Sequence, residues 1–471
     1  MLANGGIRFT DFHTASACSP TRAMLLSGTD HHIAGLGQMA EEIINHPDIW
    51  QGKAGYEGYL NDRVAALPEI MQDAGYFTTM SGKWHLGLTP KQTPAKRGFE
   101  DSFSLLPGAG NHYAHEIAES FLPPVYVRNS TYIDYATLEN FYSSDYFAAE
   151  LIKSLQSNAA VNKKPFFAYL PFTAPHWPLQ APADIIAKYK GRYDDGPFVL
   201  RKNRLKTQPM VERMDFAIGR VIDYLKESEQ FENTFILFMS DNGAEGASID
   251  SIPISSTWNP DKFFNNTYEN IGNKDSFIAY GLRWAQTATA PSRMVKGHIT
   301  EGGIRCPAIV HYPKLHTSLK ITDEFTTVMD ILPTVLELAN ISHPGTTFRK
   351  RTVVTPRGKS EYDFSGWELF GERAIRRGNY KAILVPNESN TAKWELYDLS
   401  QDKGELINIA HEREDLLKEL VEAWFIYEAE TGVILPEDGW SVRYSSDLVL
   451  SKRIQNAVAR LRYWLVPHDE I

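Results

Sequence analysis

Three segments of the chain repeat one pattern, in which apolar residues at helical spacing precede a short run of apolar, aromatic and β-branched residues. The helical stretches are residues 62–75, 144–159 and 210–229. The short runs are residues 76–80, which are β-branched and aromatic, and residues 165–170 and 234–239, which are mainly apolar. Such runs are typical of strands buried in a parallel sheet, and ligands bind beyond the carboxyl ends of these strands. The pattern therefore predicts an open α/β sheet with a functional site along one edge.

Polar residues follow each of the three runs and are candidates for chemistry. Lys83 and His85 follow the first run, His176 the second, and Asp241 and Asn242 the third. The oxygens of Asp241 and Asn242 suit Ca²⁺ or Mg²⁺, although an Asp-Asn-Gly sequence is also typical of a turn. The two histidines could exchange protons near neutral pH, whereas His176, placed between prolines, could equally be structural.

A cysteine near the start of the chain precedes another predicted helix. Ser19 is a candidate N-cap and Pro20 suits the first turn, so the helix is expected to begin just after Cys18. The positive end of the helix would stabilise a thiolate or a bound anion, and Arg22, one turn further on, could contact the same anion. The alternative is a buried structural cysteine.

The second half of the chain adds one more candidate and a change of pattern. Residues 246–295 are irregular and are expected to form substrate-facing loops, and Lys296 follows them as a second candidate anion ligand beside Lys83. A strand is predicted over residues 308–312 and a helix over residues 330–338.

Alternating runs within residues 373–399 then predict an antiparallel sheet, with a helix over residues 412–430 covering one face. The predicted divisions are a catalytic domain, residues 1–365, a smaller sheet-and-helix subdomain, residues 366–440, and a terminal helical extension, residues 441–471.

Composition excludes several classes of protein. The 471 residues are 43% hydrophobic with a formal net charge of −10, which suits a large enzyme and argues against nucleic-acid binding. Two cysteines cannot form a disulfide framework, and no apolar run is long enough to span a membrane. The first residues do not resemble a signal peptide, so we expect a soluble protein, cytoplasmic as it stands and secretory if an N-terminal segment is missing.

The candidate residues together suit one kind of reaction. Cations, an oxygen-bound metal ion and a nucleophile at a helix N-terminus are what hydrolysis of a tetrahedral oxyanion ester requires. A cysteine thiol would be an unusual nucleophile for sulfur or phosphorus.

The chain resembles the type I sulfatases, arylsulfatase-like members of the alkaline phosphatase superfamily, over nearly its whole length. The matching residues, in the family's order, are Cys18-Ser19-Pro20-Thr21-Arg22 with Ser27-Gly28, residues 75–87, Asp241-Asn242-Gly243 and Glu301-Gly302-Gly303-Ile304. The resemblance implies an α/β fold with a large mixed sheet sandwiched by helices, and a smaller C-terminal antiparallel α+β domain that begins near residues 394–399.

The resemblance also implies a mechanism. A maturation enzyme would oxidise Cys18 to formylglycine, whose hydrate attacks the sulfur of a small sulfate ester and then releases sulfate. Arg22 would stabilise the gem-diol and His85 would assist the release. Lys83, Lys296 and His176 would hold sulfate oxygens, and His176 or Lys296 would protonate the leaving alcohol. Asp241 and Asn242 would bind a divalent cation, usually Ca²⁺.

Two departures from the family pattern qualify these implications. Relatives carry a strand with an Asp-Asp pair well before the cysteine, whereas here Met1 stands just before residues 7–12, and Asp11 does not replace that pair. We therefore expect half of the metal's carboxylate shell and a central strand to be missing, as in a truncated or mis-spliced product or a fragment. Relatives also have a longer connection between Ser360 and Gly366.

Three functions remain open from the sequence. The first is hydrolysis of an aryl or similar small sulfate monoester. The second is a phosphonate or phosphodiester hydrolase with the same formylglycine, and the third is a catalytically weak remnant that binds anions.

Overall fold

The computed structural model describes residues 1–114, 125–189, 198–247, 264–315, 317–355, 363–386 and 391–435, with backbone alone for residues 198–207. The chain divides into two compact units. Unit 1 comprises Met1–Leu67, Glu232–Gly246 and Ala285–Ser445, and unit 2 comprises Pro68–Phe231, Ala247–Trp284 and Ser446–Ile471. The larger sheets of each unit are formed from strands of that unit alone.

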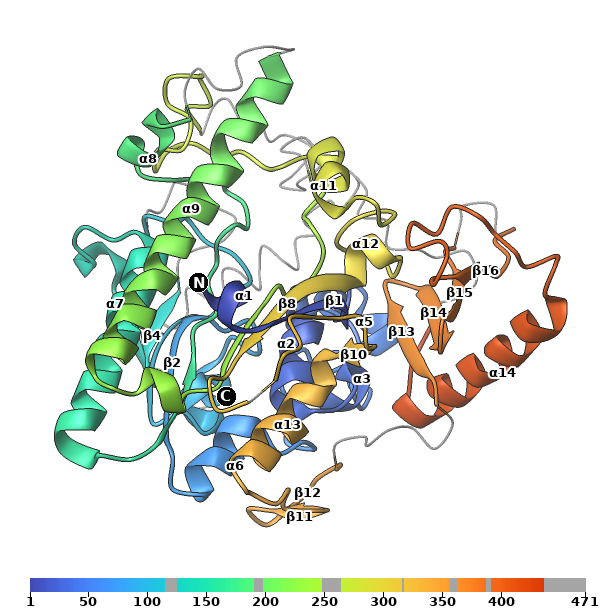
Figure 1. The fold of residues 1–471 in the computed structure, drawn as a ribbon, viewed down its shortest axis with the longest axis horizontal. Helices are drawn as coiled ribbons and strands as arrows, with labels where there is room; N and C mark the ends of the chain where they lie inside the picture. The colour runs from blue at the N-terminus through green and yellow to red at the C-terminus, as the bar shows by residue number, and fades with distance from the viewer. Residues whose placement is uncertain are drawn as a thin grey trace. The chain divides into compact units, whose positions relative to one another are not determined.

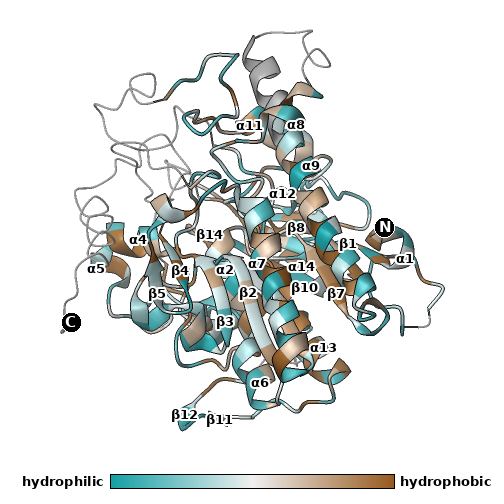
Figure 2. Ribbon diagram, turned by 90° about the vertical axis from the view of Figure 1, so that its left-hand side faces the viewer, coloured by the Kyte–Doolittle hydropathy of each residue, from teal (hydrophilic) through white to brown (hydrophobic). Residues whose placement is uncertain are grey.

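The first sheet of unit 1 has the strand order β10-β1-β8-β7, and β9 also pairs with β1. Its strands are β1 (Ile7–His13), β7 (Ile236–Met239), β8 (Arg305–His311), β9 (Ile321–Thr322) and β10 (Thr326–Thr327). Strand β8 runs antiparallel to both β1 and β7, whereas β9 and β10 run parallel to β1. Strand β7 is hydrophobic along its whole length (Figure 2).

The helix that carries the cysteine packs on this sheet. Helices α2 (Cys18–Ser27) and α13 (Ile331–Leu338) bury Met24 and Ile331 against Phe12 of β1 and Ala308 of β8. Gly28, with φ of 64°, caps the end of α2 and donates its N–H to the Met24 carbonyl at 2.8 Å.

The predicted start of α2 is wrong by two residues. The N-cap is Ala17, whose backbone is extended with φ of −145°, and the Thr21 N–H closes the first turn on the Ala17 carbonyl at 3.2 Å. Ser19 thus lies inside the helix and does not cap it. As a result, Cys18 is itself the first helical residue.

The second sheet of unit 1 is antiparallel, in the order β13-β14-β15-β16. Its strands are β13 (Ser365–Leu369), β14 (Glu372–Arg377), β15 (Tyr380–Leu384) and β16 (Glu395–Asp398). Helix α14 (Glu414–Thr431) runs alongside these strands and packs Leu420 and Trp424 on Ile375 and Leu396 (Figure 1). This confirms the predicted antiparallel sheet with a covering helix.

Unit 2 contains a five-stranded sheet in the order β5-β4-β3-β2-β6. The strands are β2 (Phe77–Lys83), β3 (Asp101–Leu105), β4 (Tyr126–Arg128), β5 (Thr131–Ile133) and β6 (Phe166–Tyr169). Strand β6 is parallel to β2, as predicted for these two runs. Strand β3, which was not predicted, is also parallel to β2. Helix α7 (Ser143–Ser157) packs against both β2 and α9 (Phe198–Glu227).

The remaining elements are short. They are α1 (Leu2–Gly5), α3 (His31–Ala34), α4 (Ala40–Asn45), α5 (Pro47–Trp50), α6 (Leu67–Asp73), α8 (Ala183–Ala187), α11 (Leu282–Thr289), α12 (Glu301–Ile304), β11 (Thr347–Phe348) and β12 (Arg351–Thr352). None of the helices in the described ranges is long and apolar enough to cross a membrane.

Four further predictions need correction or lie outside the described residues. Strand β7 was expected in a parallel sheet with the other two runs, but it is half-buried, lies in a different sheet and pairs antiparallel with β8. A continuous apolar run does not indicate strand direction. The helix predicted over residues 62–75 begins only at Leu67, and the loops predicted over residues 246–295 include α11. The terminal helix predicted within residues 441–471 lies outside the described residues.

Candidate active site

The cysteine helix of unit 1 carries two of the candidate residues. Cys18 is buried in the first turn of α2, and Arg22 follows one turn later. The Arg22 side chain donates from Nε and Nη2 to Oδ2 of Asp241, at 3.1 and 2.9 Å. A charge-assisted pair of hydrogen bonds therefore joins the cysteine helix to the turn that follows β7.

The turn after β7 carries the side-chain oxygen atoms of Asp241 and Asn242. Asn242 donates from Nδ2 to the Gly243 carbonyl at 2.9 Å, and its Oδ1 is buried with no hydrogen-bond partner in the described part of the chain. A buried amide oxygen without a donor is costly unless a cation or a ligand contacts it. The Asp241 carboxylate and this oxygen are the hard donors that Ca²⁺ and Mg²⁺ prefer, so the pair fits a divalent cation.

Two other clusters of potential metal ligands occur within the described ranges, and both are engaged otherwise. One comprises Asp11, His13 and Glu301, and the other Asp30, His31 and His32. Asp11 binds Arg376 at 2.7 Å and Glu301 binds Lys381 at 2.8 Å, so cations of the protein already neutralise the first cluster.

Lys296 is buried beside the same turn. Its Nζ lies 2.6 Å from Oε2 of Glu245, and its N–H donates to the Ala244 carbonyl at 3.0 Å. The next N–H, of Gly297, donates to the carbonyl of Ser16 at 2.8 Å, two residues before the cysteine. Sequence reasoning missed Glu245, although it stands three residues after Asn242 in the chain.

Unit 2 holds Lys83 and His85 at the carboxyl end of β2. Lys83, the last residue of the strand, is buried and its N–H donates to the Pro171 carbonyl at 2.8 Å. His85 has a left-handed backbone with φ of 58°, and its N–H donates to the Leu106 carbonyl at 3.1 Å. Its ring packs so closely on Gly108 that a Cβ there would lie 2.4 Å from Cε1. The ring therefore has little room to move toward residue 108.

His176 lies after β6 and is half-buried. Its Nδ1 is 2.9 Å from the Trp177 carbonyl, and its own carbonyl accepts from Nε2 of His112 at 3.1 Å. His112 is buried, with Nδ1 2.7 Å from the Ser143 hydroxyl. Burial lowers the pKa of His112 to about 4, so this histidine is neutral and supports the His176 backbone. No pattern in the sequence indicated His112.

The structure thus groups the candidates by unit. Unit 1 brings together Cys18, Arg22, Asp241, Asn242 and Lys296. Unit 2 contains Lys83, His85 and His176, which follow its parallel strands β2 and β6. The second cysteine, Cys306, is no competitor to Cys18, because burial raises the pKa of its thiol to about 12.

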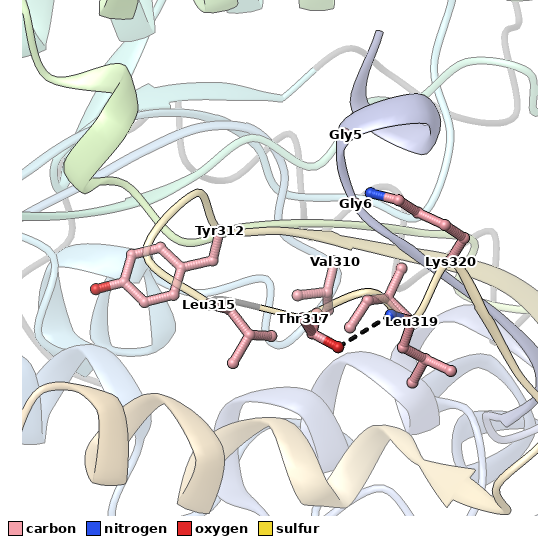
Figure 3. Close-up of a pocket in the computed structure, with 9 residues that line it drawn as sticks. Gly5, Gly6, Val310, Tyr312, Leu315, Thr317, Leu319 and Lys320 are labelled. Atoms are coloured by element: carbon pink, nitrogen blue, oxygen red, sulfur yellow. Dashed lines mark hydrogen bonds between the residues drawn. The ribbon is translucent and has the colours of Figure 1, made fainter.

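A small cavity of unit 1 lies elsewhere, at the start of β1 (Figure 3). Its lining residues are Gly5, Gly6, Ile7, Val310, Tyr312, Leu315, Thr317, Leu319 and Lys320. None of the candidate residues contributes to it, and most of its lining side chains are apolar.

Comparison with known proteins decides the family. Residues 1–341 match the family described as Sulfatase, and residues 294–424 match the C-terminal domain family of N-sulphoglucosamine sulphohydrolase. The chain belongs to the sulfatase family. It is a type I sulfatase of the alkaline phosphatase superfamily, as its motifs indicated, and family membership supports sulfate ester hydrolysis.

Individual relatives agree with this assignment. An uncharacterized sulfatase of Schizosaccharomyces pombe is 57% identical over 498 residues, which cover 93% of this chain and 90% of the relative. An arylsulfatase of Klebsiella aerogenes is 32% identical and covers 80% of this chain and 88% of its own. The crystal structure of Ps i-CgsB superposes with a TM-score of 0.68 at 22% identity, covering 98% of this chain and 91% of the other. The predicted fold class, α/β with a smaller C-terminal domain, is confirmed.

Proposed function

We propose that this sulfatase hydrolyses an aryl or similar small sulfate monoester to a phenol or alcohol and sulfate, with a formylglycine derived from Cys18. The observation that carries the proposal is the position of Cys18 at the first turn of α2, with Arg22 tied to Asp241. As formylglycine hydrate, residue 18 would supply the oxygen that attacks sulfur. A maturation enzyme of the formylglycine-generating kind is the partner that this chemistry needs.

The family resemblance implies roles for several charged side chains in the proposed reaction. Arg22 holds the hydrated group, Lys83, Lys296 and His176 bind sulfate oxygens, and His85 assists sulfate release. An ammonium group has three donors, so Lys296 can keep its contact with Glu245 while it binds a sulfate oxygen. His176 or Lys296 gives the proton to the leaving oxygen, because the leaving alkoxide or phenoxide must be neutralised.

The donor set of Asp241 and Asn242 supports a divalent cation, Ca²⁺ in the first instance. These two residues would hold it through the carboxylate and through Oδ1, which accepts no hydrogen bond from the described residues. The cation would supply positive charge near the sulfate oxygens, where negative charge must be balanced during the reaction.

The experiment combines mass spectrometry with turnover. The protein is expressed with a formylglycine-generating enzyme, the fraction of converted residue 18 is measured, and hydrolysis of an aryl sulfate and of an aryl phosphodiester is compared. We expect conversion at residue 18, a preference for the sulfate and no activity in Cys18→Ala. A preference for the phosphodiester would contradict this proposal and support a phosphonate or phosphodiester hydrolase. Full conversion without turnover would favour the anion-binding remnant.

Thermal unfolding tests the cation separately. Binding to the folded state alone raises the Tm in proportion to the logarithm of ligand concentration, so Ca²⁺ should stabilise the wild type and not Asn242→Ala. Equal shifts in both proteins would contradict the assignment of Asn242.

A further inference from the structure

Residues 296–304, called here the Lys296 loop, form hydrogen bonds with two elements that carry candidate residues. The N–H of Lys296 donates to Ala244, and that of Gly297 donates to Ser16. In the opposite direction, the Gly243 N–H donates to the Gly303 carbonyl at 2.8 Å. The position of this loop therefore determines where the Lys296 ammonium lies relative to the cysteine helix and to the turn of Asp241.

On its other side the loop is bound by charged side chains of the C-terminal sheet. Glu372, the first residue of β14, accepts from His298 Nδ1 at 2.7 Å and from the Ile299 N–H at 2.9 Å. Lys381 of β15 donates to the Ile299 carbonyl at 3.0 Å and to Oε1 of Glu301 at 2.8 Å. Through these contacts, Glu372 and Lys381 hold main-chain and side-chain atoms of the Lys296 loop.

Glu405, which follows β16, completes the set. Its Oε2 accepts from the Glu301 N–H at 2.9 Å, and its Oε1 accepts from Lys381 at 2.9 Å. The side chains of Glu301, Lys381 and Glu405 are fully buried. Buried charges are tolerated only with close partners in good geometry, so the loop has little freedom to shift without breaking an ion pair.

Apolar contacts support the same attachment. Ile299 and Ile304 of the loop pack on Trp367, Ile383 and Tyr397 of the sheet. This is the face of the sheet opposite the cluster that packs on α14. The C-terminal sheet therefore has one face for its own helix and one for the Lys296 loop.

We propose that Glu372, Lys381 and Glu405 are positioning residues that hold Lys296 where it binds the sulfate group. This inference rests on the proposed role of Lys296 as a sulfate ligand. It makes the C-terminal sheet, together with Glu405 after β16, a part of the catalytic apparatus, although none of these three residues touches the substrate.

The test measures the affinity of the protein for inorganic sulfate by calorimetry, together with kcat/KM for an aryl sulfate. The variants are Glu372→Gln and Lys381→Met, each in the wild type and in Lys296→Met. A displacement of about 1 Å in a positioned group can cost on the order of 100-fold in rate, so we expect losses of about 10-fold to 100-fold. In the Lys296→Met background the same changes should cause no further loss, because they act through Lys296.

Leu420→Ala is the matched control. Leu420 is buried between α14 and the opposite face of the sheet, so its truncation lowers stability without touching the loop. Sulfate affinity and kcat/KM should stay at the wild-type level well below the Tm. Glu372→Gln keeps the inference testable if Lys381→Met does not fold, because it replaces one oxygen by an isosteric amide nitrogen.

Equal losses with and without Lys296 would overturn the inference, as would sulfate affinity that Glu372→Gln leaves unchanged. Failure of the proposed function looks different. In that case the wild type does not hydrolyse the ester, while the pattern of sulfate affinities still supports the positioning role.

Discussion

The two units hold their candidate residues in different ways. In unit 1, Arg22 pairs with Asp241 and Lys296 with Glu245, so residues far apart in the sequence are joined by opposite charges. In unit 2, the backbones of Lys83 and His85 are held by hydrogen bonds to the carbonyls of Pro171 and Leu106. The contribution of an ion pair to stability depends on pH, whereas that of a hydrogen bond between neutral backbone groups does not.

Two buried histidines extend this comparison. His32 of unit 1 lies 2.7 Å from Asp30 and 2.9 Å from Glu368. Burial opposes its charge, but the two carboxylates outweigh burial and raise the pKa of His32 to about 9. In His112 of unit 2, burial prevails over a hydrogen bond to the His176 carbonyl and lowers the pKa to about 4. The same side chain is therefore charged in one unit and neutral in the other, because only one of them faces carboxylates.

The largest effect is expected at Arg22. Lysine cannot reproduce the paired donation from Nε and Nη2, and loss of one charge-stabilising donor typically costs about 10²–10³ in rate. Arg22→Lys should therefore lower kcat/KM for an aryl sulfate by up to about 10³. Arg213 donates to Asp145 from the same two atoms, at 2.8 and 2.6 Å, and Arg213→Lys is the matched control. Similar losses in both variants would show that the effect is not specific to the cysteine helix.

The second prediction concerns stability against pH. The pKa of His32 is raised above its ordinary 6.5, so its imidazolium stabilises the fold fully below about pH 6.5. That contribution, on the order of 3 kcal/mol, is lost as the pH rises through about 9. Urea unfolding between pH 6.5 and 9.5 should show this loss in the wild type and a much smaller one in His32→Gln. His112→Gln should keep the wild-type slope, and equal slopes in all three proteins would refute the charge assignment.

The third prediction tests the close contact of His85 in unit 2. A Cβ on Gly108 would lie 2.4 Å from the ring, and the ring is a side chain that can turn away, so Gly108→Ala displaces His85 without a large loss of stability. Activity should fall by about 10²-fold if His85 assists the reaction. Gly110→Ala is the control, because its Cβ would meet only Leu105 at 3.2 Å. Full activity in Gly108→Ala would argue against a role for the His85 ring.

The smallest effect is expected at Ser143. Removing its hydroxyl leaves Nδ1 of the buried His112 without this partner, which should cost about 1 kcal/mol at pH 6 and at pH 9 alike. The neighbouring Ser144 is also buried, but its hydroxyl has no partner within the described ranges, so Ser144→Ala should be neutral or slightly stabilising. Denaturant titration of the two variants measures the difference, and a pH-dependent cost in Ser143→Ala would mean that His112 carries charge.

Much of the fold could be predicted from local patterns. The parallel strands β2 and β6, the helix α7 and the antiparallel sheet beneath α14 follow from periodicities of two and 3.6 residues. Strand direction was less accessible, as β7 shows, because an apolar run is compatible with either orientation. The start of α2 was misplaced because Ser19 is a good cap residue by type, whereas the extended N-cap backbone lies at Ala17, whose side chain cannot cap.

The motif residues of the candidate site could be predicted from the sequence, but the residues that contact and support them could not. Cys18, Arg22, Lys83 and His85 lie in short motifs whose spacing is visible in the chain. Glu245 and His112 lie in no such motif, since each acts by facing a residue from another element.

By itself the sequence determined the type of chemistry, the family and the elements that carry the candidate residues, because these depend on residue type and short-range spacing. Only the tertiary structure decided which charges are paired. The contacts of Lys381 with Glu301 and of His32 with Glu368 join residues 80 and 336 positions apart. Periodicity tells which face of an element is buried, but it does not tell which side chain of another element faces it. For that reason the attachment of the Lys296 loop to the C-terminal sheet emerged only from the structure.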